Sequence, residues 1–402
     1  MTASSDPAPR PAVTPRIGVY DPVLLTLLLA AAAAALGSGF VGVALNRLVS
    51  GMPIALWGAA GPGFTTGLAI LGGVLLALSL TPPRPAVAMA AAVAAGTWLL
   101  VTVAALGAAA HALAAAAPPA ERVSAGPAFW TIAGCAALAI VAALQRLRAG
   151  PALSAAVVAA VCGGIVLLAF AGGLDALSIA REYATRRALF AAALTRHIVL
   201  VAASVGPALL IGCPLGVVLV RRQRLQGPIF AVLNLLQTVP SIALFGLLIV
   251  PLSAVAAAVP QLAALGVGGI GPAPAIIALV LYALLPIVRN TVSGISGVDP
   301  GVIDAARGVG LTQAQIFWRV ELPLAVPILV AGLRIVTVQT IGLAVVAALI
   351  GAGGLGTFVF EGLGQYALDL VLLGALPAIG LALAADFVLH LASASLSRVA
   401  PR

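Results

Sequence analysis

Long apolar runs separated by short polar breaks make up most of this chain. Five runs fall in the first half, at 22–45, 63–81, 86–110, 128–144 and 151–171, and five in the second, at 197–220, 228–250, 272–289, 327–350 and 368–391. Each is near the ~20 residues that a helix needs to cross the hydrocarbon core of a bilayer. The pattern therefore predicts an all-α, polytopic membrane protein with about ten transmembrane helices.

The polar breaks divide these runs into two sets. Residues 1–20 are rich in proline and polar residues, which predicts a disordered cytoplasmic tail. Residues 21–175 hold the first five runs, and residues 176–402 hold the other five. Between the sets, residues 172–196 are more polar, which favours an interfacial helix on the outer leaflet with its arginines among headgroups. The first run mimics a signal peptide, but the long region before it favours an uncleaved first helix.

Composition agrees with a membrane protein and argues against a nucleic-acid interface, a P-loop and a metal or cofactor site. The chain of 402 residues is 62% hydrophobic and 8% charged, too apolar for a soluble globular protein. Its net charge of +9 comes from arginines scattered singly between apolar runs, which does not favour nucleic-acid binding. All 20 basic residues are arginine, and a phosphate-binding P-loop needs lysine, so ATP hydrolysis must come from a separate subunit. The few cysteines and histidines form no ligand pattern, and we expect no metal or cofactor.

The arginines also predict the orientation in the membrane. With the N-terminus inside, 13 arginines fall on the inner side and 6 on the outer side, and Arg334 lies within a span. This bias follows the positive-inside rule. It predicts a multi-pass protein of the cell (inner) membrane, with both termini and the loop 298–326 in the cytoplasm. Four of the six exceptions lie in residues 172–196.

The loop 298–326 is the longest segment of the second half that is not mostly apolar. Asp299 followed by Pro300 has the form of a helix N-cap, because proline at the first helical position loses no hydrogen bond. Gly308 and Gly310 then end this helix. Its small face of Asp304, Ala305 and Ala306 would let the surface of another protein approach closely.

A second short helix is expected directly after Gly310. Thr312 and Gln315 have the spacing of a capping box, and Pro323 and Pro327 are expected to limit the helix. The loop therefore predicts two short helices, at an angle to each other, on the water side of the membrane.

The spacing of the loop resembles the cytoplasmic coupling loop of permease subunits of ABC importers. The family pattern is an acidic residue with two alanines, three residues, glycine, nine residues, an aliphatic residue, any residue, and Leu-Pro. The matching residues here are Asp304, Ala305, Ala306, Gly310, Val320, Leu322 and Pro323. Asp304 stands where the family usually has glutamate, and Val320 where it often has isoleucine, which affects fine docking geometry only. An ordinary amphipathic loop and a DNA-reading helix-turn-helix fit less well, because the spacing, Leu-Pro and flanking spans coincide and the cations are few.

Three further motifs extend the resemblance over residues 185–395. They are Leu236-Gln237-Thr238-Val239-Pro240-Ser241 with Ala243-Leu244-Phe245-Gly246, Asn290-Thr291 leading into Gly297-Val298-Asp299-Pro300, and Ile350-Gly351-Ala352-Gly353-Gly354-Leu355-Gly356. The first two resemble permeases for glycine betaine, choline, carnitine and related osmoprotectants, including a long form with five extra N-terminal spans.

The resemblance implies a fold, partners and a mechanism. It implies a type I permease core of five helices that works as a dimer with itself or a related permease. Two ABC ATPase subunits would dock on the coupling loop, and an external substrate-binding protein would deliver the ligand. ATP binding would move the coupling helices and rock the spans between inward-open and outward-open states. Residues 21–175 would then be an accessory membrane region.

Polar residues gather at two places within the apolar runs. Pro240 should bend its helix and free a carbonyl group. The residues concerned are Gln237, Thr238, Pro240 and Ser241 at the bend, and Thr337, Gln339 and Thr340 in the next-to-last run. They form either a polar translocation pathway or a packing kink with side chains bonded to the backbone. The intramembrane charges Arg334 and Asp386 lie near the cytoplasmic side and can pair.

Other functions were weighed against this hypothesis. An ABC permease for another small solute, such as an amino acid, fits the coupling loop equally well. A secondary transporter driven by an ion gradient needs acidic residues or histidines at mid-membrane, and the sequence has almost none. A purely structural membrane anchor leaves the coupling loop unexplained.

Overall fold

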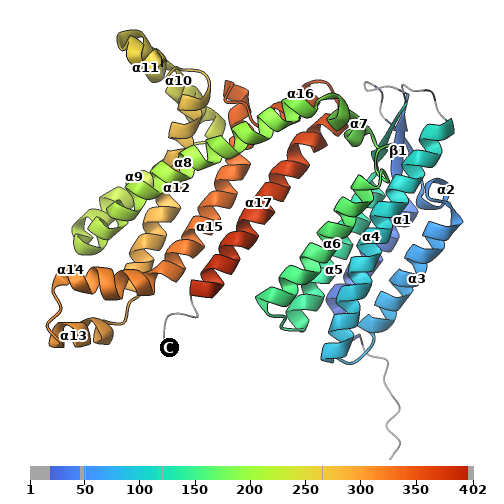
Figure 1. The fold of residues 1–402 in the computed structure, drawn as a ribbon, viewed down its shortest axis with the longest axis horizontal. Coiled ribbons are helices and arrows are strands. Elements are labelled where there is room, and N and C mark those ends of the chain that lie inside the picture. The colour runs from blue at the N-terminus through green and yellow to red at the C-terminus, as the bar shows by residue number, and fades with distance from the viewer. Residues whose placement is uncertain are drawn as a thin grey trace, which may run out of the picture. The chain divides into compact units, whose positions relative to one another are not determined.

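The computed structural model describes residues 19–45, 49, 51–116, 118, 121–264 and 266–396, so the predicted tail at 1–20 lies almost entirely outside the described residues. The chain forms two compact units, Met1–Ala180 and Arg181–Arg402 (Figure 1). Within the described part, nine helices are long and apolar enough to cross a membrane, and the helix Pro22–Gly37 is apolar but shorter. The predicted helical membrane fold is therefore confirmed.

The first unit is a bundle of antiparallel helices that follow the predicted runs. They are α1 (Pro22–Gly37), α2 (Leu56–Ala59), α3 (Gly61–Ser79), α4 (Pro85–Ala116), α5 (Pro127–Arg146) and α6 (Pro151–Phe170). Alanines fill the contact between α4 and α5, because small side chains let two helices approach closely in a membrane. Ala95 and Ala109 of α4 and Ala136 of α5 are fully buried there.

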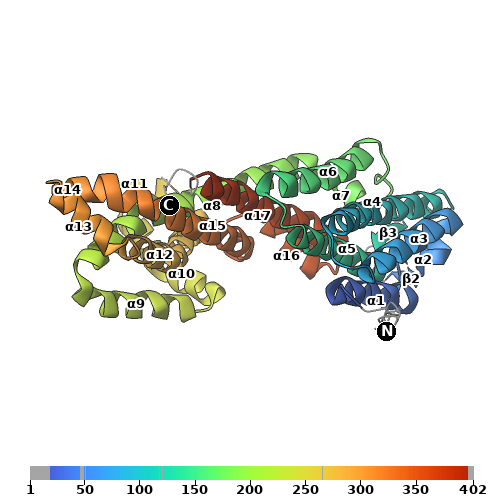
Figure 2. The same ribbon diagram turned by 90° about the horizontal axis from the view of Figure 1, so that it is seen from below.

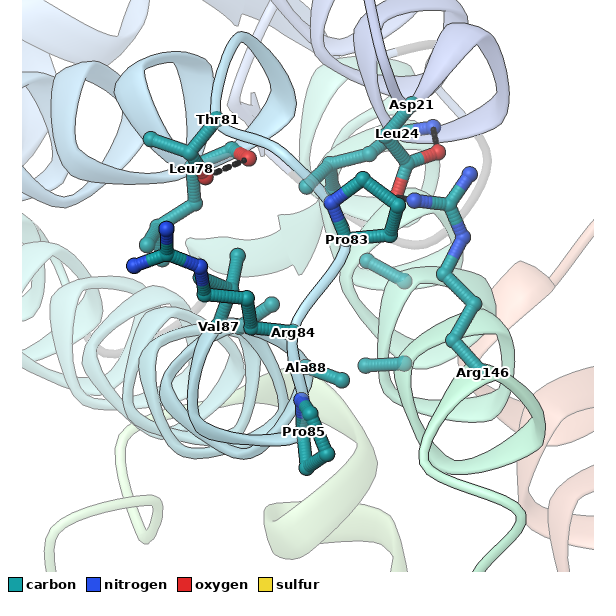
Figure 3. Close-up of a pocket in the computed structure, with 13 residues that line it drawn as sticks. Asp21, Leu24, Leu78, Thr81, Pro83, Arg84, Pro85, Val87, Ala88 and Arg146 are labelled. Atoms are coloured by element: carbon teal, nitrogen blue, oxygen red, sulfur yellow. Dashed lines mark hydrogen bonds and ion pairs between the residues drawn. The ribbon is translucent and has the colours of Figure 1, made fainter.

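An ion pair fastens one end of this bundle. Asp21 caps α1, and its carboxylate accepts a hydrogen bond of 2.8 Å from the backbone N–H of Leu24. The same side chain lies 2.6 Å from the guanidinium of Arg146, the last residue of α5 (Figure 3). Asp21 is 6% exposed, so its burial is offset by two charge-assisted contacts.

A small sheet at the other end of the bundle was not predicted. It consists of β1 (Val41–Ala44), β2 (Met52–Ile54) and β3 (Arg122–Ala125), in the order β2-β1-β3 with antiparallel pairs. The predicted span at 22–45 was therefore wrong in its last part, where residues 41–44 form β1 instead of helix. Helix α1 stops at Gly37 because the following Ser38 is extended, and Val41 then pairs with both Ile54 and Ala125.

The second unit contains the remaining helices. They are α7 (Ser178–Thr185, which begins just before the unit boundary), α8 (Arg187–Arg221), the 3-10 turn η1 (Gln223–Leu225), α9 (Gln226–Thr238), α10 (Ser241–Ala258), α11 (Pro260–Ala264), α12 (Pro272–Ser296), α13 (Pro300–Gly308), α14 (Gln313–Ile316), the π-helix η2 (Phe317–Glu321), α15 (Leu322–Val346), the 3-10 turn η3 (Ala347–Ile350), α16 (Gly356–Gly364) and α17 (Leu368–Leu396). Helix α12 is central, between α15 on one side and α9 and α10 on the other (Figure 2). Its buried face includes Ala275, Ala278 and Leu279, which pack with Leu200 of α8 and Val336 of α15.

Two predicted elements of this unit differ in the structure. The expected span at 228–250 is two helices, because Val239 is extended and Pro240 starts a new helix. The polar segment 172–196 is also not one interfacial helix. Its first part forms the short helix α7, and its second part belongs to α8, which runs for 35 residues from Arg187.

Candidate functional site

The first helix of the loop 298–326 is built as its sequence predicts. Helix α13 begins at Pro300, and the Asp299 side chain accepts a hydrogen bond of 2.7 Å from the N–H of Gly301. The helix ends at Gly308. Helices α13 and α14 lie at the end of the second unit opposite α11 and α16 (Figure 1).

Gly310 makes the turn between the two loop helices. Its φ is +84°, in the left-handed region that side chains with a β-carbon disfavour. A Cβ placed here would meet no atom within 4 Å, so the constraint is backbone conformation and not space. The predicted capping box follows: Thr312 N–H donates to Gln315 Oε1 at 2.8 Å, and Gln315 N–H donates to Thr312 Oγ1 at 3.4 Å.

The predicted end of the second loop helix was wrong. Neither Pro323 nor Pro327 ends the helix. Helix α14 continues through η2 into α15 as one helical segment. Pro323 lies in the first turn of α15, just after the π-helix. In η2 the N–H of Leu322 bonds to the carbonyl of Phe317, five residues back, and this wider turn accommodates the missing N–H of proline.

The face that the loop presents differs in part from the expected one. Asp304 and Ala305 are exposed, and Asp304 accepts a hydrogen bond of 3.0 Å from Arg307. Ala306, expected on the same face, is 8% exposed and points into the unit. Sequence reasoning missed Val309 and Trp318, which are 79% and 66% exposed. Large apolar side chains in an otherwise polar loop were the available signal, because such exposed groups mark interaction surfaces.

An ion pair with a buried carboxylate joins the loop to the C-terminal end of α8. Glu321, the last residue of η2, is 3% exposed, and its carboxylate binds the guanidinium of Arg221 at the C-terminal end of α8. The next two residues are Leu322 and Pro323, the end of the coupling pattern. No sequence signal linked these two charges, which lie 100 residues apart.

The polar bend at Pro240 is attached to the central helix. The side-chain amide of Gln237 donates 2.6 Å to the carbonyl of Tyr282 in α12, and the Tyr282 hydroxyl donates to the carbonyl of Val239. Thr238 bonds to the carbonyl of Leu235 in its own helix. These side-chain bonds to backbone carbonyls agree with the interpretation of the bend as a packing kink. Pro240, by contrast, is exposed and Ser241 is partly exposed.

The three polar residues of α15 are partly or fully buried in the second unit. Thr337 Oγ1 donates 2.8 Å to the carbonyl of Leu333, Thr340 is 2% exposed, and Gln339 is partly exposed. Val336 of α15 and Val239 of the bend both belong to the large hydrophobic cluster of the second unit. The coupling loop lies apart from them.

The intramembrane charges pair as the sequence suggested. Arg334 of α15 binds the carboxylate of Asp386 of α17, and a second guanidinium nitrogen lies 3.3 Å from Nδ1 of His390. The ion pair therefore links α15 to α17, and the charges of Arg334 and Asp386 compensate each other within the protein.

Two of the six arginines that run against the positive-inside count, Arg186 and Arg196, have partners at the end of the second unit away from the loop. Arg186 lies 3.4 Å from Glu182 and 2.8 Å from Glu361. Arg196 donates 3.1 Å to the carbonyl of Ala352 in the glycine-rich turn after η3. That turn is tight, with positive φ at Gly351, Gly353 and Gly354.

Comparison with known protein families accounts for both units. Residues 16–180 match the family model described as the N-terminal domain of the ABC transporter permease YehY. Residues 208–398 match the model of the binding-protein-dependent transport system inner membrane component.

Individual relatives match about half of the chain. The osmoprotectant import permease protein OsmW of Salmonella typhimurium is 42% identical over 210 residues, which cover 52% of this chain and 93% of that protein. The choline transport system permease protein OpuBB of Bacillus subtilis is 39% identical over 50% of this chain and 85% of its own length. Among solved structures, an inward-facing MetNI methionine ABC transporter chain is 24% identical, with a TM-score of 0.44, covering 54% of this chain and 99% of that one.

Proposed function

Because the chain belongs to the family of inner-membrane permease components of binding-protein-dependent ABC transport systems, we propose that it is the membrane subunit of an importer for osmoprotectants. The ligand class is glycine betaine, choline, carnitine or a related quaternary ammonium compound. The names of relatives at 42% and 39% identity support this class. The chain has no lysine for a P-loop, so we assign ATP hydrolysis to a separate partner subunit.

The geometry of the coupling loop is the observation that carries this proposal. Helix α13 exposes Asp304 and Ala305, and Val309 and Trp318 add apolar area beside them. A short helix with a small-residue face and apolar neighbours suits docking on an ATPase subunit. The other partners are an external binding protein and a second permease, either a copy of this chain or a related one.

The link between Glu321 and Arg221 gives a route for the motion. Movement of the docked helix α13 would reach α14 across the turn at Gly310, and α14, η2 and α15 form one continuous helical stretch that would carry it into the core. The ion pair passes the same movement to α8. Helices α8 and α15 both pack on α12, which is attached to the polar bend by Gln237. The pathway of Gln237, Thr238, Pro240, Ser241, Thr337, Gln339 and Thr340 would then open or close.

The orientation is also part of the proposal. The loop end of the second unit carries Arg307 and Arg319, and the end of α8 that contacts it carries Arg221 and Arg222. At the opposite end Arg186 and Arg196 are held by local partners, which weakens their value as orientation signals. These charges support a cytoplasmic loop, and we propose both termini on the same side from the arginine bias of the sequence.

A different small solute is the alternative ligand. An ion-driven secondary transporter has less support, because Asp386 is paired with Arg334, and protonation of Asp386 would leave the Arg334 charge without its counter-ion. Reconstitution with the ATPase and binding protein separates these cases. We expect ATP-dependent uptake of radiolabelled glycine betaine or choline that stops when the binding protein is left out. Uptake driven by a proton or sodium gradient without ATP would overturn the importer assignment, and ATP-dependent uptake of an amino acid alone would overturn the ligand class.

A further inference from the structure

Arg334 and Asp386 pair deep within the two neighbouring helices that carry them. Helices α15 and α17 pack side by side (Figure 1). Arg334 is the middle residue of α15, with twelve residues on either side, and Asp386 lies ten residues before the end of α17. At 1.5 Å per residue these offsets are ~18 Å and ~15 Å, near the middle of a ~30 Å hydrocarbon core. The ion pair therefore lies further from the cytoplasmic side than the sequence suggested.

Both members of the pair are also open on the surface of the second unit. Their side chains are 39% and 37% exposed, and His390, one turn further along α17, is exposed. A guanidinium carries five N–H groups. Here Nε of Arg334 binds Oδ1 of Asp386 and Nη1 lies 3.3 Å from Nδ1 of His390. Among the described residues nothing accepts from Nη2 of Arg334 or donates to Oδ2 of Asp386, so the pair has an open donor and an open acceptor.

Lipid tails cannot satisfy these open groups. Hydrocarbon offers no hydrogen-bond partner, and a polar group that faces it without one costs several kcal/mol. Arginines near helix ends avoid this cost by reaching the headgroups. Arg334 cannot do so while Nε binds Asp386 on the neighbouring helix. The side of α15 and α17 that carries the pair is therefore covered by something other than lipid.

The surroundings of the pair are those of a protein contact and not of a water-filled passage. Ile379, Leu383, Asp386 and His390 follow the i, i+4, i+7 and i+11 spacing of one helix face. Ile379 and Leu383 are 55% and 65% exposed, and Ile335 on α15 is 55% exposed. Large apolar side chains around a few polar groups are typical of the centre of a protein interface, where they exclude water from the polar contacts.

The charges select a second copy of this chain as the covering protein. The long helices of the first unit, α1 and α3 to α6, contain no charged residue except Arg146 at the end of α5, so they offer no anion at this depth. A second copy offers the same open donor and open acceptor at the same depth. In a two-fold dimer, a contact of residue i with residue j is matched by a contact of j with i. Nη2 of Arg334 in each copy can then donate to Oδ2 of Asp386 in the other.

We propose that α15 and α17 dock on the same two helices of a second copy, with the two Arg334–Asp386 pairs facing each other across a two-fold axis. This inference rests on the proposed pairing of permease subunits. It names the surface of that pairing and selects a copy of this chain over a related permease. The surface, called the Arg334 face below, consists of Arg334, Ile335, Ile379, Leu383, Asp386 and His390.

Cross-linking of single cysteines tests the position of the Arg334 face. Two full-length copies with different affinity tags are made without Cys135, Cys162 and Cys213. Leu383→Cys in both copies should give a covalent dimer that carries both tags when membranes are treated with a short bis-maleimide. Leu210→Cys on α8 is the matched control, because Leu210 is also exposed and lies at a similar distance from the cytoplasmic end of its helix. The control should give no covalent dimer.

A charge exchange tests whether the two ion pairs meet. Arg334→Asp combined with Asp386→Arg keeps an ion pair within each chain, so the variant should fold. Two exchanged copies should co-purify as the parent copies do, because opposite charges still meet across the axis. An exchanged copy with a parent copy places arginine against arginine and aspartate against aspartate. We expect recovery of this mixed dimer to fall by about tenfold or more, since like charges across an interface repel strongly.

Three results would overturn the proposal. Equal cross-linking at Leu383 and Leu210 would reflect random collision in the membrane. Tags that co-purify without a Leu383 cross-link would mean that the copies pair through another surface. Equal recovery of mixed and matched dimers would mean that the ion pairs do not face each other. ATP-dependent uptake by the reconstituted parent complex is measured alongside, so that failure of the Arg334 face and failure of the proposed importer are recognised separately.

Discussion

Arg221 at the C-terminal end of α8 binds the carboxylate of Glu321 at the last turn before α15. The carboxylate is buried, whereas the arginine side chain is 43% exposed. Removing the arginine would leave a buried charge without its partner, which costs several kcal/mol for a fully buried pair. Solvent access to Arg221 reduces this free-energy cost, and we expect the Arg221→Ala variant to lose about 1–2 kcal/mol of stability.

The pair gives a first prediction about coupling. Arg221→Ala should lower the thermal unfolding midpoint and reduce transport, while the binding-protein stimulation of ATP hydrolysis weakens. The charge exchange Arg221→Glu with Glu321→Arg should recover part of both. Arg222→Ala is the control, because Arg222 is the next arginine along the chain and its side chain is also exposed. Unchanged stimulation in Arg221→Ala would mean that the ion pair only stabilises the fold.

The turn at Gly310 gives a second prediction. A residue with a β-carbon in the left-handed region costs about 1–2 kcal/mol, and a β-branched one costs more. Gly310→Val should therefore abolish transport while the protein still inserts in the membrane, and Asp304→Arg should do the same by changing the docking face. Gly308→Val is the matched control, since that glycine also has open space but has no positive φ. ATPase co-purification and uptake are the measurements, and normal uptake by Gly310→Val or Asp304→Arg would exclude docking at this loop.

Orientation can be tested by labelling. In a chain without Cys135, Cys162 and Cys213, a single cysteine at Thr312 should react with an impermeant reagent only from the cytoplasmic side. A single cysteine at Gln261 in α11 should react only from the outside. Labelling of both from one side would contradict the proposed topology.

Aromatic residues of the core give a prediction about ligand choice. Quaternary ammonium groups are usually bound over aromatic faces, each worth about 2 kcal/mol when desolvated. Phe245 is fully buried and Tyr282 is 5% exposed, so neither ring face is free for a ligand. Phe245→Leu and Tyr282→Phe should change the transport rate more than the preference between betaine and choline. A reversed preference in competition uptake would place the selective site inside the membrane.

The role of the first unit can be tested by truncation. The relative at 42% identity matches 210 residues of this chain over 93% of its own length, so a related permease has little more than half the length of this chain. A truncated chain that starts near Leu177 should still bind the ATPase, which co-purification would measure. If the truncated chain inserts but does not bind the ATPase, residues 1–175 are not an accessory region.

Local sequence was enough to predict most of the helices and the form of the coupling loop. The apolar runs located the membrane helices, since a helix satisfies its backbone hydrogen bonds within itself and needs only a sufficient apolar length. The cap at Asp299, the turn at Gly310 and the capping box of Thr312 each involve residues within a few positions of one another. Such contacts form in any fold that contains the loop, and the sequence specifies them completely.

Only the tertiary structure decided the features that join distant segments. Val41 pairs with Ala125, Glu321 binds Arg221, and Gln237 donates to the carbonyl of Tyr282. The partners in each of these contacts lie tens of residues apart, so no periodic pattern relates them. The free energy of each contact depends on which helix faces pack together and which groups that packing removes from water.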